Sequence, residues 1–153
     1  MSNKKHILVI DDEEAVRRSF ELALEDSGYM VTSVDNGASG VSEVKNNSYQ
    51  LVFLDLKMPG MNGVKTLQKI REISMSLPIY VVTAFHKEFL IELDEVRKAG
   101  LPFQLLRKPI GSVEILALAQ SVLELLSNVV YSIRRRSCLA VQPLVPHLQI
   151  LRC

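Results

Sequence analysis

Five side chains capable of chemistry stand where short apolar runs of the sequence end. They are three carboxylates, a hydroxyl and an ammonium, from Asp11, Asp12, Asp55, Thr83 and Lys108. Clustered carboxylates repel one another and raise one another's pKa unless a cation joins them. A few hard oxygen ligands suit Mg²⁺, which keeps several waters and favours phosphate oxygens as partners. Beside such an ion, the carboxylate of Asp55 can act as a nucleophile toward a phosphoryl group.

Each of these side chains has a simpler explanation when it is taken alone. Asp11, Asp12 or Thr83 can cap the helix that follows it, and a lone lysine is usually solvated. Asp55 is harder to explain in this way, because an unpaired charge at the end of a buried strand is costly. Since all five lie at comparable places, we interpret them as one site. In that site the ion and Lys108 offset charge on transferring oxygens, and Thr83 donates a hydrogen bond.

The apolar runs themselves read as strands that alternate with helical patterns. The runs are 6–10, 30–34, 50–54, 78–82 and 103–106. Val16, Phe20 and Ala23 mark one face of the first helix, and similar patterns follow the other runs, which predicts an α/β fold with a parallel sheet. Polar residues interrupt 30–34 and 103–106, so these two suit the sheet edges. Because ligands bind at the carboxyl ends of parallel strands, the five side chains should converge.

The segment after Asp55, LKMPGMNG at residues 56–63, breaks the strand pattern sharply. Pro59, Gly60 and Gly63 are residues that turn a chain within a few positions. We expect this turn to keep the space over Asp55 open and to let the backbone approach a bound ion closely.

The composition of the 153-residue chain fits one folded domain with a further segment. Apolar residues make up 48% of the chain and charged residues 23%, which allows a buried core. Residues 1–126 hold 14 Lys and Arg against 17 Asp and Glu, whereas residues 127–153 hold four Arg and no acid. No dense basic stripe lies on the part expected to fold, so nucleic acid is not an expected direct partner.

Cysteine usage and hydropathy favour a cytoplasmic protein. Cys138 and Cys153 both lie near the C-terminal end of the sequence, so no disulfide framework can hold the fold. The opening residues MSNKKHILVIDDEE contain too short an apolar run for a secretory signal. The apolar window 113–133 contains Glu114 and Glu124, and we interpret it as an amphipathic helix and not as a membrane span.

Four motifs together resemble the receiver domain of two-component response regulators. They are ILVIDDEE, LVFLDLKMPGMNG, VVTA and LLRKP, in the family's order and approximate spacing, and the resemblance covers residues 4–126. It implies a flavodoxin-like fold in which five helices flank a doubly wound five-stranded sheet of order 2-1-3-4-5, an order for which receivers are a standard example. It also implies a signalling protein that catalyses only its own phosphorylation and dephosphorylation.

The resemblance further implies the roles of the acidic residues. Asp55 would accept a phosphoryl group from a sensor histidine kinase or a phosphotransfer protein. Asp12 and Asp55 would bind Mg²⁺ directly and Asp11 through water. The backbone carbonyl of Lys57 would be a further ligand. Phosphorylation would then switch a surface that binds an output domain or a downstream protein.

Thr83 and Lys108 are the switch residues that the resemblance implies, and the Lys108–Pro109 bond is expected to be cis. The family usually has an aromatic residue three positions before this lysine. This sequence has Leu105 there, and its nearest aromatic residue is Phe103. Strand register favours Leu105, but the sequence leaves open which of the two side chains serves as the inward-moving switch residue.

Other classes of protein share parts of this pattern. A Mg²⁺-dependent phosphohydrolase of the haloacid dehalogenase type also uses Asp, Thr and Lys at strand ends, but it needs Asp-x-Asp after the first strand, where this sequence has DDEE. A flavodoxin-like cofactor binder needs a Ser/Thr/Gly-rich loop after ILVI, which is missing. A degenerate receiver that is only a binding module would not need all five site residues. The phosphohydrolase and the degenerate receiver remain the alternatives.

Residues 127–153 are expected to form a helical extension and a tail of unknown role. Six apolar residues have the heptad spacing of a coiled coil: Leu116, Ala119, Leu123, Leu126, Val130 and Ile133. No Gly or Pro interrupts residues 112–136, so the last helix should run past the domain. A second copy of this helix is the simplest cover for the stripe, which predicts a homodimer. Nothing after residue 136 resembles an output domain, and the sequence leaves open whether one follows.

Overall fold

The structure is a computed structural model that describes residues 4–84 and 87–139. Within the last helix, it describes the backbone but not the side chains at residue 126 and residues 130–139.

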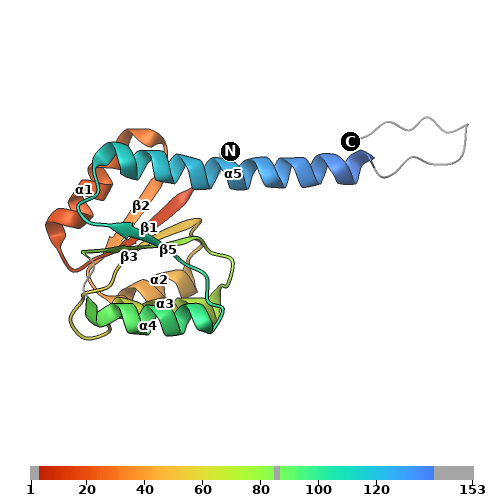
Figure 1. The fold of residues 1–153 in the computed structure, drawn as a ribbon. Coiled ribbons are helices and arrows are strands. Elements are labelled where there is room, and N and C mark those ends of the chain that lie inside the picture. Colours follow the sequence, from red (N-terminus) through yellow and green to blue (C-terminus); the bar gives the residue numbers. More distant parts are fainter. Residues whose placement is uncertain (1–3, 85–86, 140–153) are drawn as a thin grey trace, which may run out of the picture. The chain divides into compact units, whose positions relative to one another are not determined.

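Strands and helices alternate along the described chain, as the sequence pattern predicts (Figure 1). In chain order the elements are β1 (His6–Ile10), α1 (Glu14–Leu24), the short 3-10 helix η1 (Glu25–Ser27), β2 (Met30–Val34), α2 (Gly37–Asn46), β3 (Leu51–Asp55), α3 (Gly63–Ile73), β4 (Ile79–Thr83), α4 (Lys87–Lys98), β5 (Gln104–Arg107) and α5 (Ser112–Leu139). All strand pairs are parallel, and the sheet order is β2-β1-β3-β4-β5. The predicted doubly wound fold is therefore confirmed, with β2 and β5 at the edges.

Three strands differ from the predicted ranges by one residue. β3, β4 and β5 each begin and end one position later than the apolar runs indicate. The ladder continues through polar residues, because Asp55 pairs with Val82 and Thr83 pairs with Arg107. Asp55 and Thr83 are thus the last residues of their strands, where main-chain hydrogen bonds fix the backbone beneath each side chain.

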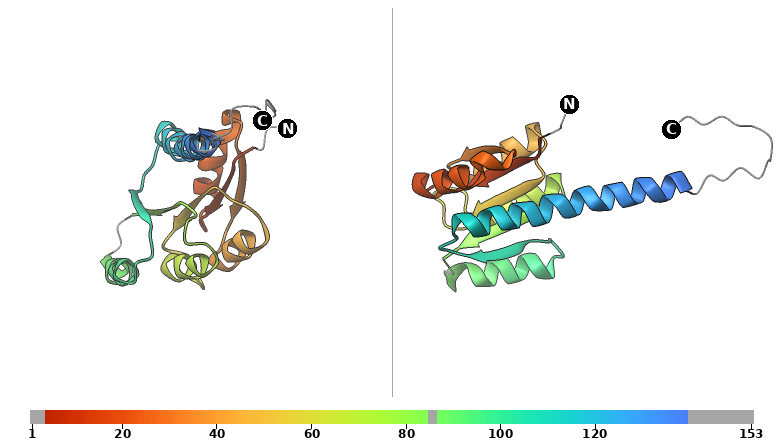
Figure 2. Two further views of the ribbon diagram at one scale, coloured as in Figure 1. Left: turned by 90° about the vertical axis from the view of Figure 1, so that its right-hand side faces the viewer. Right: turned by 90° about the horizontal axis from the view of Figure 1, so that it is seen from above.

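Helices cover both faces of the sheet (Figure 2). α1 and the first part of α5 lie on one face, and α2, α3 and α4 lie on the other. Successive side chains of β1 alternate between the two sides: Leu8 belongs to the core on the α2–α4 side, and Ile7 and Val9 belong to the core on the α1 side. Burying an Ile, Leu or Phe side chain stabilises a fold by about 1.5–3 kcal/mol, so two cores hold each central strand in place. This is why the apolar runs 7–10 in β1 and 51–54 in β3 are unbroken.

The last helix continues beyond the domain, as the absence of Gly and Pro predicts. α5 runs from Ser112 to Leu139 without interruption. The chain divides into two compact units, Met1–Leu123 and Glu124–Cys153, and α5 contributes to both.

One described window, Ser112–Val129, is long and apolar enough to cross a membrane by length and composition alone. The same window carries Ile115, Ala119 and Leu123, which are buried in the core on the α1 side. The core helix of a folded domain also meets this criterion, so the window is weak evidence for a span.

Candidate functional site

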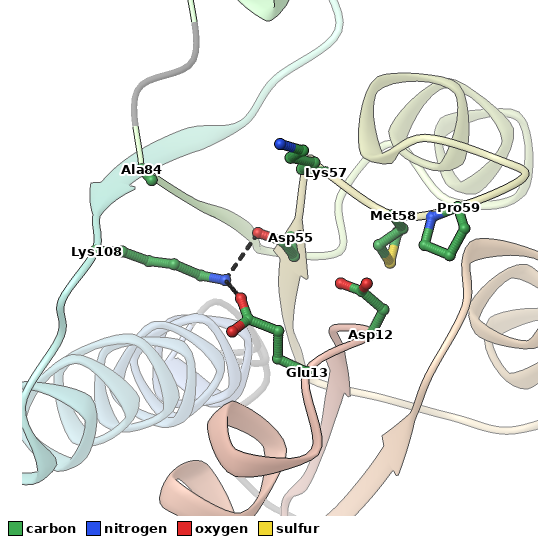
Figure 3. Close-up of a pocket in the computed structure, with 8 residues that line it drawn as sticks. All are labelled: Asp12, Glu13, Asp55, Lys57, Met58, Pro59, Ala84 and Lys108. Atoms are coloured by element: carbon green, nitrogen blue, oxygen red, sulfur yellow. Dashed lines mark hydrogen bonds and ion pairs between the residues drawn. The ribbon is translucent and has the colours of Figure 1, made fainter.

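An open cavity of about 700 Å³ lies at the carboxyl ends of the strands. Its lining comes from the loops that follow β1, β3, β4 and β5: Asp12, Glu13, Asp55, Lys57, Met58, Pro59, Ala84 and Lys108 (Figure 3). The convergence expected from the parallel topology is therefore present for four of the five strands.

The three predicted carboxylates form one cluster. Asp11, Asp12 and Asp55 each offer an oxygen within 4.8 Å of those of the other two. Asp11 and Asp55 are buried, whereas Asp12 is exposed at the cavity. Oxygens at this spacing, two of them shielded from water, are a donor set that suits a hard divalent cation such as Mg²⁺.

Lys108 is the cation that faces this cluster. Its Nζ lies 2.9 Å from Asp11 Oδ2, 3.0 Å from Asp55 Oδ1 and 3.3 Å from Glu13 Oε1. Figure 3 shows Lys108 reaching toward Asp55 and Glu13, with Asp12 beyond Asp55. Lys57 also lines the cavity, so two ammonium groups stand against four carboxylates, which still leaves excess negative charge there. That excess is an electrostatic reason for a metal cation to bind.

Burial and charge shift the pKa of each inner group. Burial raises the pKa of Asp55 to about 6, the bond from Lys108 opposes this, and the nearby charges of Asp11 and Asp12 add to it. Burial also raises the pKa of Asp11, against its bonds from Lys108 and from the Glu13 backbone. For Lys108 burial alone would lower the pKa, but the bonds to Asp11 and Asp55 outweigh burial and raise it above its ordinary value.

The contact between Glu13 and Lys108 is one that the sequence interpretation missed. Glu13 stands directly after the acidic pair in DDEE, but the sequence gives no sign that its side chain turns toward Lys108. Its backbone N–H donates to Asp11 Oδ1 at 2.9 Å, which helps to fix the buried carboxylate.

The loop between β3 and α3 passes close to Asp55, as its Pro and Gly residues predict. Gly60 has a φ of 78°, a conformation that favours glycine. A side chain on Gly63 would place its Cβ 2.1 Å from the backbone oxygen of Asp55. The Gly63 N–H also donates to the carbonyl of Leu56 at 2.9 Å. Glycine at position 63 therefore lets the start of α3 sit directly against the end of β3.

Asn62 fixes the start of α3 just beyond this close approach. Its side-chain oxygen accepts a hydrogen bond from the backbone N–H of Lys65 at 2.9 Å, which makes it the N-cap. The loop that carries Met58 and Pro59 past the cavity is thus anchored at both ends.

The two predicted switch residues lie at the carboxyl ends of neighbouring strands, with Thr83 as the last residue of β4 and Lys108 directly after β5. Thr83 is buried at the end of β4, and its carbonyl accepts a hydrogen bond from the backbone N–H of Lys108 at 2.9 Å. The next residue, Ala84, lines the cavity. The Lys108–Pro109 bond is cis, as expected from the dipeptide.

Leu105 and Phe103 have different surroundings. Leu105 is partly buried on the α2–α4 side and pairs with Val81 of β4, two residues before Thr83. Phe103 lies just before β5, is buried in the same core, and has the guanidinium of Arg97 5.1 Å from its ring centre. Of the two, Leu105 is the closer along the strand to the site.

Comparison with known proteins identifies the family. A family model for the response regulator receiver domain matches residues 7–120. The uncharacterized transcriptional regulatory protein YkoG of Bacillus subtilis is 38% identical over 81 residues, 53% of this chain and 36% of that protein. The transcriptional regulatory protein FixJ of Bradyrhizobium diazoefficiens is 28% identical over 123 residues, 80% of this chain and 58% of that protein.

A solved structure agrees with this match. The CheY-like response regulator receiver domain protein of Methanospirillum hungatei JF-1 superimposes with a TM-score of 0.71 at 25% identity, covering 80% of this chain and 95% of that one. The chain belongs to the family of response regulator receiver domains, which are signalling modules. It spans 36% and 58% of the lengths of YkoG and FixJ. Family membership gives no support to the phosphohydrolase and cofactor-binding alternatives.

Proposed function

We propose that this chain is a phospho-accepting receiver whose acceptor is Asp55 and whose donor is a sensor histidine kinase or a phosphotransfer protein. The observation that carries this proposal is the position of the Asp55 carboxylate. It ends a buried strand at the wall of an open cavity, with the Lys108 ammonium 3.0 Å away. A carboxylate held in this way can attack a phosphorus atom that enters through the cavity.

In the proposed transfer, an Asp55 carboxylate oxygen bonds to phosphorus while the bond from phosphorus to the donor's imidazole nitrogen breaks. The electron pair of that bond stays on the imidazole, and Asp55 becomes an acyl phosphate. Lys108 donates to a phosphoryl oxygen, and the hydroxyl of Thr83 donates to another. Asp12 and Asp55 would hold Mg²⁺ directly, Asp11 through water, and the Lys57 carbonyl would complete the protein ligands. When bound, the ion would supply positive charge that offsets the charge of the carboxylates and of the phosphoryl group.

Phosphorylation with acetyl phosphate and Mg²⁺, followed by intact mass measurement, tests the acceptor. We expect one added phosphoryl group on the wild-type chain and none on Asp55→Asn. Asp35→Asn is a matched control, because Asp35 is an exposed acid at the end of β2. Equal phosphorylation of the Asp55→Asn chain would reject this acceptor. A wild-type chain that takes up no phosphoryl group would instead support a degenerate receiver.

The metal ligands need a separate measurement. Asp12→Ala removes a proposed direct oxygen ligand and should weaken Mg²⁺ binding by about tenfold or more, because loss of even an outer-shell partner typically costs about 10–100-fold. NMR titration of backbone amides measures the affinity. Glu14→Ala removes an exposed acid two residues away and should leave the affinity within about twofold. Equal affinities for all three chains would place the ion elsewhere.

The proposed output is a change in what the domain binds. Drawing Thr83 and Lys108 onto the phosphoryl group would shift a two-state equilibrium on the face made by α4, β5 and the first part of α5, with Leu105 as the inward-moving side chain. The core position of Phe103 beneath Arg97 supports Leu105 in this role. Transcriptional regulation by YkoG and FixJ supports an output domain or downstream protein that controls transcription. We also infer a cytoplasmic location, which the positions of the two cysteines support.

A further inference from the structure

We propose that Glu13 is a resting-state latch that occupies Lys108 and gives way when Asp55 is phosphorylated. This inference deepens the proposed function and rests on it where phosphoryl binding is concerned. The contact itself, 3.3 Å from Lys108 Nζ to Glu13 Oε1, is a property of the unphosphorylated protein.

The first argument concerns the number of donors on Lys108. An ammonium has three N–H groups. In this structure three carboxylates accept them, from Asp11, Asp55 and Glu13. Lys108 can therefore donate to a phosphoryl oxygen only if one of its three present partners leaves.

The second argument decides which partner leaves. Phosphorylation bonds one Asp55 oxygen to phosphorus, and the second carboxyl oxygen of Asp55 can stay beside Lys108 as an acceptor, so the choice lies between Asp11 and Glu13. The Asp11 side chain is 4% exposed, and its backbone carbonyl accepts a further hydrogen bond from Arg17 at 2.8 Å. Leaving this carboxylate unpaired inside the protein would be costly. The Glu13 side chain is 63% exposed and makes the longest of the three contacts, so water can replace Lys108 at little cost. Glu13 is the partner that yields.

The third argument comes from the helix that begins beside Glu13. Glu13 occupies the N-cap position of α1, where a side-chain oxygen usually accepts a bond from the first turn. Its side chain makes no such cap bond. Instead it turns across the cavity to Lys108 (Figure 3). Glu13 can thus be neutralised without removing a helix cap.

A latch of this kind opposes phosphoryl binding. Glu13 and a phosphoryl oxygen compete for the same N–H of Lys108, so the resting contact raises the amount of phosphodonor needed to fill the site. Glu13 is a positioning residue in this scheme, since it acts on the phosphoryl group only through Lys108. Its removal should favour the phosphorylated state.

The test uses beryllofluoride, a stable phosphoryl mimic, bound to the full chain at saturating Mg²⁺ and followed by fluorine NMR. Glu13→Gln should bind it more tightly by about two- to fivefold, the size expected when an exposed ion pair is lost. Glu14→Gln makes the same charge change one residue away and should bind like the wild type. Glu13→Asp keeps the charge but shortens the side chain by one methylene, so it should behave like Glu13→Gln.

Two results would overturn the latch. One is equal or weaker binding by Glu13→Gln than by the wild type. The other is wild-type behaviour of Glu13→Asp together with tighter binding by Glu14→Gln, because charge alone would then explain the effect.

A second readout separates failure of the latch from failure of the proposed function. In the metal-free protein, the protons of the Lys108 ammonium should exchange with water faster in Glu13→Gln than in the wild type, as measured by nitrogen-15 NMR of lysine side chains. Exchange in Glu14→Gln should be unchanged. If the wild type binds no beryllofluoride, the proposed function fails and this exchange rate alone decides the latch. Unchanged exchange in Glu13→Gln would overturn it.

Discussion

Asp55 is a side chain whose ionisation is opposed both by burial and by nearby negative charge. Its pKa in the folded protein is raised to about 6, from an ordinary value of 3.8, by burial first and then by Asp11 and Asp12. At pH values between these two pKa values, the folded chain binds more protons than the unfolded chain. The contribution of Asp55 to the free energy of unfolding is therefore present below about pH 4 and is lost as the pH rises through about 6.

This shift predicts that Asp55→Asn stabilises the metal-free protein at neutral pH. An amide does not ionise, so at pH 7 in EDTA the variant should exceed the wild type by about 1–3 kcal/mol in urea unfolding. At pH 4 the difference should be small, because Asp55 is then largely protonated. Mg²⁺ should raise the stability of the wild type more than that of the variant. A difference in unfolding free energy between the two chains that does not grow between pH 4.5 and pH 7 would contradict the raised pKa of Asp55. Asp35→Asn is the control variant.

The loop from β3 to α3 depends on the absence of a side chain at position 63. In Gly63→Ala the added Cβ would clash with the backbone of Asp55 and Leu56, which cannot move without disturbing β3. We expect a loss of about 2–4 kcal/mol in urea unfolding. The comparable change at Gly111 meets nothing within 4 Å, so Gly111→Ala should cost less than about 1 kcal/mol. Equal losses in the two variants would show that the close approach does not limit stability.

Arg71 links the loop after α3 to the loop before β5, at the end of the sheet away from the cavity. Its side chain is buried, and its guanidinium donates to the carbonyls of Pro102, Ser74 and Leu77. These bonds hold the C-terminal end of α3 against the segment that leads into β5. The carbonyls at the end of α3 also carry partial negative charge, which favours a cation there.

We therefore expect Arg71→Met to destabilise the fold by about 2–4 kcal/mol in urea unfolding, because it leaves buried carbonyls without donors. Arg97→Met removes a guanidinium that stacks on Phe103, and should cost about 1 kcal/mol or less. A smaller loss of unfolding free energy for Arg71→Met than for Arg97→Met would count against this role of Arg71.

For the whole molecule, the open question is what covers the apolar stripe of the last helix. α5 continues to Leu139, so the backbone needed for a longer helix is present. In the first part of the helix, Ile115, Ala119 and Leu123 are buried in the domain. The side chains of the remaining stripe residues lie outside the described set: Leu126, Val130 and Ile133. Their role as a contact between two copies stays a prediction.

We expect the full chain to sediment as a dimer at micromolar concentration and a chain that ends at Leu126 to sediment as a monomer. Charged residues at Val130 and Ile133 should also give a monomer, because they place charge in a heptad seam. Asn128→Asp adds the same kind of charge outside the stripe and should leave the dimer intact. Monomers from both the full and the shortened chain would reject this contact.

Local patterns in the sequence determined the fold and most of the site. The apolar runs and helical spacings predicted a parallel α/β sheet, because both periods follow from local backbone geometry. A parallel sheet brings its carboxyl ends to one edge, so the meeting of Asp55 with Asp11, Asp12 and Lys108 was predictable without coordinates.

Contacts between distant residues needed the tertiary structure. Glu13 and Lys108 are 95 residues apart, and whether an exposed carboxylate reaches an ammonium depends on how α1 and β5 pack. The carbonyl of Pro102 that satisfies Arg71 lies 31 residues away in another loop, so no local pattern could show that this arginine is buried. The pKa of Asp55 likewise depends on its depth in the folded chain. Sequence periodicity specifies which face of an element is buried, but the pairing of individual side chains follows from packing in three dimensions.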